Sequence, residues 1–169
     1  SNATVTLSSA ATDINASGVP KAINQASTHG ITLGSNTNIA STTITNPSAL
    51  TLGDNVTATM TQAQHEAFSA INATGSGEQI TLTTAGVVTA ASGVETYVLA
   101  AAGGSNITLG ANAQSVTTGA SSADTITVGT RTATGTFNTV AADIISLGDG
   151  ADIKGVNGEG AGAGKALDA

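Results

Sequence analysis

A short phrase of alternating apolar and polar residues recurs along this chain at nearly constant spacing. It is clearest at residues 126–129 (Ile-Thr-Val-Gly) and 145–148 (Ile-Ser-Leu-Gly), which lie 19 residues apart. An aspartate stands two residues before the first apolar position in both copies. A fixed period near 20 residues indicates a solenoid of stacked coils. Complete and weaker copies of the phrase begin at Val5, Ile31, Leu50, Ile80, Ile107, Ile126 and Ile145.

The alternation within each phrase predicts a short β-strand with two buried side chains and an exposed threonine between them. A repeat of about 19 residues leaves room for a second short strand and two turns in every coil. Stacking would place the first apolar residue of each phrase, including Ile80, in one column with its equivalents. The sequence therefore predicts an all-β protein, a β-roll-like β-solenoid of about 19 residues per coil.

One segment departs from the strand pattern. Residues 61–72 carry Thr61 and Gln64 at the spacing of a capping box, the side-chain arrangement that begins many helices. Ala63, Ala67, Phe68 and Ile71 then fall on one face at helical spacing, which places His65 on the polar side. We expect one short helical excursion from the solenoid, and either it covers an apolar edge or it binds a partner.

Composition agrees with thin β layers. Of 169 residues, 40% are hydrophobic, 9% charged and 2% aromatic, and there is no cysteine, so neither a disordered chain nor a disulfide framework is indicated. A net charge of −7 argues against nucleic acid as a partner, and no apolar run approaches the roughly 20 residues of a membrane span. Residues 1–3 resemble the remnant of a cleaved tag on a piece of a longer protein. We expect one solenoid domain over residues 4–155 and a Gly/Ala-rich tail or linker over residues 156–169.

The aspartates in the C-terminal repeats occur in a pattern that resembles a known family of repeats. Residues 148–152 (Gly-Asp-Gly-Ala-Asp) match the Gly-x-Gly-x-Asp core of the nine-residue unit of RTX (repeats-in-toxin) β-rolls. The surrounding segment resembles degenerate RTX-related repeats of large secreted bacterial surface proteins, adhesin-like or S-layer-like. This resemblance implies calcium as the bound ion, with Asp124, Asp143, Asp149 and Asp152 as its ligands. From the residues alone each Asp could instead cap a turn, and earlier copies of the phrase carry Ser48, Glu78 and Ser105 in the same slot.

The function that follows is a non-catalytic structural or adhesion segment of a large extracellular or cell-surface bacterial protein, stiffened by calcium. Its expected partners are a cell-surface or host ligand, or another copy bound through the solenoid ends. No nucleophile motif supports an enzyme. Two alternatives stay open: an ice-binding solenoid, and a carbohydrate-active β-helix domain, which the scarcity of aromatic residues disfavours. The ice-binding alternative depends on the threonine runs Thr57, Thr59, Thr61 and Thr130, Thr132, Thr134, Thr136.

Overall fold

The chain forms a β-solenoid in a computed structural model, with parallel strands that follow one another at about 19 residues per turn and one short helix. The predicted fold class is confirmed. The structure describes residues 30–129 except 74, 112 and 113, residues 143–147, and the backbone of short strands nearer both ends. Those strands cover residues 4–6, 14–15, 22–24, 132–133, 137–139, 152–153, 156–158 and 166–168.

The elements are short, mostly of two to five residues. Their bounds in chain order are β1 (Thr4–Thr6), β2 (Ile14–Asn15), β3 (Ala22–Asn24), β4 (Ile31–Leu33), β5 (Thr37–Asn38), β6 (Thr43–Thr45), β7 (Ala49–Leu52), β8 (Thr57–Met60), α1 (Gln62–Ala67), β9 (Ala70–Ala73), β10 (Gln79–Leu82), β11 (Val87–Thr89), β12 (Thr96–Val98), β13 (Asn106–Thr108), β14 (Ser115–Thr117), β15 (Thr125–Gly129), β16 (Thr132–Ala133), β17 (Phe137–Thr139), β18 (Ile144–Leu147), β19 (Asp152–Ile153), β20 (Val156–Gly158) and β21 (Ala166–Asp168).

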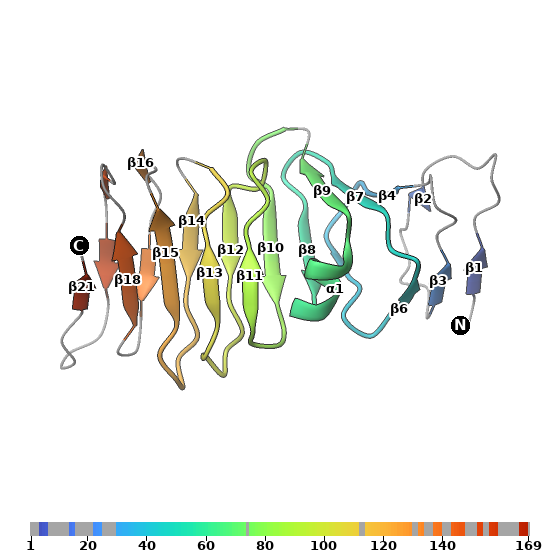
Figure 1. The fold of residues 1–169 in the computed structure, drawn as a ribbon. Coiled ribbons are helices and arrows are strands. Elements are labelled where there is room, and N and C mark those ends of the chain that lie inside the picture. Colours follow the sequence, from blue (N-terminus) through green and yellow to red (C-terminus); the bar gives the residue numbers. More distant parts are fainter. Residues whose placement is uncertain are drawn as a thin grey trace.

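From β10 to β15, successive strands alternate between two faces of an elongated stack, with β1 and β21 at opposite ends (Figure 1). Strands β1-β3-β6 and β16-β19 pair in separate sheets of their own. The long sheet, in the order β20-β17-β14-β12-β10-β8-β5, runs along one face. On the other face two sheets follow one another, β2-β4-β7-β9 and then β11-β13-β15-β18-β21. Because β9 and β11 each end their sheet, this face is interrupted between them, whereas β10 pairs with both β8 and β12 on the long sheet.

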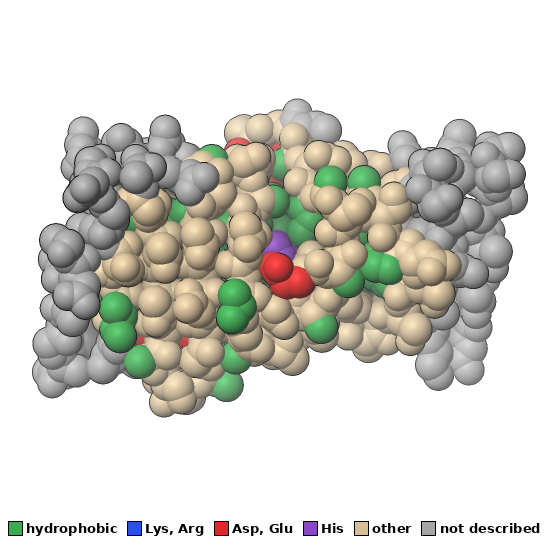
Figure 2. All heavy atoms as spheres, viewed as in Figure 1, with side chains coloured by type: hydrophobic (Ala, Val, Ile, Leu, Met, Phe, Trp, Pro, Cys, Tyr) green, Lys and Arg blue, Asp and Glu red, His purple; other side chains and the backbone are tan. Residues whose placement is uncertain are grey.

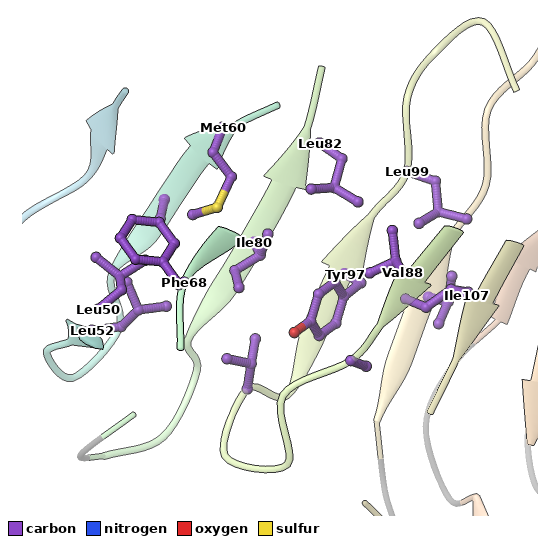
Figure 3. Packing of buried hydrophobic residues seen from close by; sticks show 14 of the residues in the cluster. Leu50, Leu52, Met60, Phe68, Ile80, Leu82, Val88, Tyr97, Leu99 and Ile107 are labelled. Atoms are coloured by element: carbon purple, nitrogen blue, oxygen red, sulfur yellow. The ribbon is translucent and has the colours of Figure 1, made fainter. Parts of the chain in front are cut away.

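Alternation in the sequence becomes alternation in burial. Strands β7, β8 and β10 each show two buried side chains separated by partly exposed ones. In-register pairing stacks the buried positions into columns, as β-branched side chains on a pleated surface favour. The buried side chains form one cluster from Ile23 to Ile145, and Figure 3 shows Phe68 and Tyr97 among its aliphatic members. One column contains Val88, Ile107, Ile126 and Ile145.

The predicted column was wrong at Ile80. Ile80 lies on β10 of the long sheet, in register with Ala58 and Tyr97. The residue that follows Leu50 on its own sheet is Ile71 of β9. The sequence analysis therefore assigned the strand of Ile80 to the wrong face of the solenoid. The pattern Ile-Thr-Leu predicts a strand but does not distinguish between the faces.

The helix is shorter than predicted, and its buried side differs. Thr61 and Gln64 do form the capping box, but α1 ends at Ala67 because Ser69 already donates its N–H to the carbonyl of Ser48 in the sheet. Ala63 and Ala67 are exposed, while His65 is buried. Pairing of β9 with β7 outweighs the helical periodicity of residues 69–72.

The segments at both ends of the chain can be compared with the expected solenoid domain of residues 4–155. Residues 1–3, the suspected tag remnant, lie outside the described residues. Within the Gly/Ala-rich segment 156–169, strands β20 and β21 pair with β17 and β18 in parallel register. Across the part of the chain that the structure describes, no helix combines the length and the hydrophobicity needed to cross a membrane.

Candidate functional site

Two buried aspartates join neighbouring coils at the turns that lead into β15 and β18. Asp124 Oδ1 accepts the N–H of Ser105, one coil earlier, at 2.6 Å, and its Oδ2 accepts the N–H of Gly119 at 2.7 Å. Asp143 Oδ1 accepts the N–H of Asp124 at 2.8 Å, and its Oδ2 accepts the Thr118 hydroxyl at 2.7 Å. Asp124 thus connects its own coil to the coils before and after it.

These contacts do not fit the calcium that the RTX resemblance implies. Calcium takes six to eight oxygen ligands, yet all four carboxylate oxygens of Asp124 and Asp143 already accept hydrogen bonds from protein donors. Three of those donors are backbone N–H groups that cannot ligate a cation. Asp149 and the side chain of Asp152 lie outside the described residues. Among the described residues, no three histidine, aspartate or glutamate side chains are grouped so that they could hold a metal ion.

A second pair of acidic residues lies at the turns, here called the acidic corner, that lead into β10 and β12 of the long sheet. Sequence reasoning did not predict this pair. Glu78 precedes β10 and Glu95 precedes β12, and Glu95 Oε2 accepts the N–H of Glu78 at 2.9 Å. Glu78 therefore belongs to this corner, which corrects its predicted place in the slot of Asp124. The two residues are 17 positions apart, each directly before a β-prone run. Aligning the second strand of every coil, as well as the first, would have found them.

Gln114 occupies the position equivalent to Glu95 on the next coil, with an uncharged side chain. Its Oε1 accepts the N–H groups of Gly110 and Ala111, and its Nε2 donates to the carbonyls of Ala91 and Val94. The buried amide thereby uses both its acceptor and its donors, as buried polar groups do in folded proteins. Corner side chains of this protein thus act chiefly as links between coils.

A hollow marks the interruption between β9 and β11. It measures about 440 Å³ and lies beside α1, and Figure 2 shows a histidine and an acidic side chain next to each other there, with apolar atoms behind them. The helix takes the place of a missing strand along β11: Gln62 Nε2 donates to the carbonyl of Val87 and Glu66 Oε1 accepts the N–H of Thr89. This geometry supports the role of an edge cover for α1. The lining residues are His65, Glu66, Phe68, Ala70, Ile71, Asn72, Thr89, Ala90, Ala91 and Ser92.

His65 is held in this hollow by a directed chain of hydrogen bonds. The N–H of Ala91 donates to the Tyr97 hydroxyl at 2.7 Å, which leaves the Tyr97 O–H to donate to His65 Nε2 at 3.2 Å. The neutral ring then donates Nδ1–H to Glu66 Oε1 at 2.9 Å. Burial lowers the pKa of His65, although the hydrogen bond and charge of Glu66 act in the opposite direction. Burial also raises the pKa of Tyr97, which keeps its hydroxyl protonated as the donor to His65.

The structure has an aligned row of hydroxyl groups outside both predicted threonine runs. Thr89, Thr108, Thr127 and Ser146 are in register on successive strands and point outward. The neighbouring outward row is mixed, with the large apolar side chains Val87 and Ile144 exposed at its ends. Of the second predicted run, Thr130, Thr134 and Thr136 lie outside the described residues, as does the side chain of Thr132. Of the first run, Thr57 and Thr59 lie on β8 in register with Gln79 and Thr81, so hydroxyl groups on the long sheet alternate with other side chains.

The described side chains therefore provide links between coils, a partly apolar hollow and outward rows that contain hydroxyl groups. Lys21, Arg131, Lys154 and Lys165 all lie outside the described side chains, so the described surface carries acidic groups and no lysine or arginine. A comparison with models of known protein families, with curated proteins and with solved structures finds no match for this chain.

Proposed function

We propose that this chain is a non-catalytic structural segment of a large secreted or cell-surface bacterial protein, in which stacked coils form a stiff spacer. The observation that carries the proposal is the linkage through Asp124. The side chain of this one buried residue accepts N–H groups of the preceding coil and of its own turn, and its backbone N–H donates to Asp143 of the following coil. A repeated structure whose units contact only their neighbours transmits load along its axis through such links.

The ends of the stack support a route to self-association. The described strands β1 and β20 each have a partner on one side only. A terminal strand presents unpaired backbone groups to which another chain can add. A second copy that adds to a terminal strand is one partner that we propose, and a cell-surface ligand is the partner that an adhesive role requires.

Single-molecule pulling on the two ends of the chain tests the spacer function. We expect extension to proceed through discrete unfolding events, and we expect the Asp124→Ala variant to unfold at lower force because two inter-residue links of the loaded stack are lost. Asp54→Ala is the matched control: Asp54 also accepts a backbone N–H from another coil, that of Ser76, but on the exposed surface. Smooth extension of the unaltered chain without unfolding events would refute the proposal.

Calcium remains a proposal for the last coils, where Asp149 and Asp152 match the RTX unit. An ion that binds only the folded state raises the melting temperature. We therefore expect millimolar calcium chloride to raise the melting temperature by about 3 °C relative to EDTA, an increment lost in D149N/D152N and kept in Asp54→Asn. Identical melting temperatures in calcium and in EDTA would remove the ion from the proposal and leave the spacer held by hydrogen bonds.

A further inference from the structure

Glu78 carries a buried carboxyl group that no described donor reaches. The residue is 0% exposed, and both side-chain oxygens lack a hydrogen-bond partner. Glu95 occupies the equivalent position on the next coil, since Gln79 and Thr96, the residues that follow them, are paired in register. Glu95 Oε2 accepts the N–H of Glu78, so the Glu95 carboxylate lies against the backbone of Glu78.

An ionised carboxylate would be poorly accommodated at this position. A charge removed from water needs a counter-charge or donors around it, and the charged groups that act on Glu78 are Glu95 and Asp54, both acidic. No lysine or arginine is found among the residues whose side chains are described. Because Glu95 offers only acceptor oxygens, a hydrogen bond between the two side chains requires a proton on one of them.

We propose that Glu78 and Glu95 share one proton at neutral pH, and that loss of this proton weakens the contact between the coils of β10 and β12. Two neighbouring carboxyl groups in a confined site hold one proton between them because both cannot ionise without repulsion. The pair is thereby a pH-sensitive link in the long sheet, at the level of the interruption on the opposite face.

The electrostatics of the site agree with this arrangement. Burial, the neighbouring carboxyl group of Glu95 and the charge of Asp54 raise the pKa of Glu78, and only the backbone of Glu78 acts in the opposite direction. The folded protein therefore binds this proton more tightly than the unfolded chain, whose glutamate has the ordinary pKa of 4.5. The free energy of unfolding consequently falls as the pH rises above that value, and it stops falling once the pair has lost its proton.

Glu78→Gln tests the shared proton, because the amide donates to Glu95 permanently and cannot ionise. Between about pH 7 and about pH 9, where histidine is already neutral, we expect the melting temperature of the unaltered chain to fall and that of E78Q to stay level. At the upper end E78Q should be the more stable by about 3 °C. Glu159→Gln removes the same charge from the Gly/Ala-rich segment and should keep the slope of the unaltered chain. Equal slopes in E78Q and the unaltered chain would overturn the proposal.

A direct measurement covers the case in which E78Q folds poorly. In protein labelled with 13C-glutamate, the side-chain carboxyl resonances report the ionisation of each residue in the unaltered chain. We expect one proton distributed over Glu78 and Glu95 at neutral pH, seen as resonances displaced from the position of a fully ionised glutamate in a reference peptide. Fully ionised resonances for both members of the pair at neutral pH would show that no proton is shared.

Discussion

Replacement of Gly110 by alanine should be among the most damaging single changes in the described part of the chain. A Cβ at this position would overlap the carbonyl oxygen of Ala90 and lie 2.9 Å from its carbon and 3.0 Å from the N atom of Ser92. These are backbone atoms of the preceding coil, and they can move only if the strand spacing changes. We expect a loss of about 4 kcal/mol in the free energy of unfolding, measured by urea denaturation.

Gly93→Ala is the matched control for this prediction. Its Cβ would meet Ala73 at 3.4 Å from the backbone N and 3.5 Å from the Cβ, which are ordinary contacts, and Gly93 is exposed. Since neither glycine has a positive φ, the pair isolates the effect of close approach between coils. The control should stay within about 0.5 kcal/mol of the unaltered chain. Equal effects of the two substitutions would contradict the close approach at Gly110.

Asp124→Ala should be nearly as damaging for an electrostatic reason. The variant leaves the N–H groups of Ser105 and Gly119 buried without an acceptor. Each unsatisfied buried donor costs about 1–3 kcal/mol, so the free energy of unfolding should fall by about 4 kcal/mol and the melting temperature by about 10 °C. The measurement is a thermal melt followed by circular dichroism.

The exposed counterpart of Asp124 separates burial from the simple loss of a hydrogen bond. Asp54 Oδ1 accepts the N–H of Ser76 at 2.9 Å on the surface, where water can replace it. Asp54→Ala should therefore cost about 0.5 kcal/mol. If both variants melted at the same temperature, the two buried bonds of Asp124 would not be the links that hold its coils together.

The regular part of the fold could be predicted from the sequence because its spacing is strict. Ile107, Ile126 and Ile145 are 19 residues apart, and the structure pairs them in register. The middle of the chain was less predictable. The equivalent positions Leu50, Ile71, Val88 and Ile107 are separated by 21, 17 and 19 residues. Because these intervals are unequal, the sequence analysis assigned the residues of β9 to the end of the helix.

The candidate site was predictable only in part. Asp124 and Asp143 are visible as acidic residues at a fixed place in the repeat, but whether each binds a cation or an N–H group depends on turn geometry that the period does not specify. The burial of His65 depends on Tyr97, which is 32 residues away. A polar residue on a short helix reads as exposed until such a distant partner is known.

The interruption between β9 and β11 has a mechanical consequence. Sheet β20-β17-β14-β12-β10-β8-β5 is continuous across this level, whereas the opposite face is held there by side chains of α1. A beam that is notched on one side bends about the side that remains intact. The spacer should therefore bend most easily at β10, in one preferred direction that opens or closes the notch, while the coils on either side of it stay stiff.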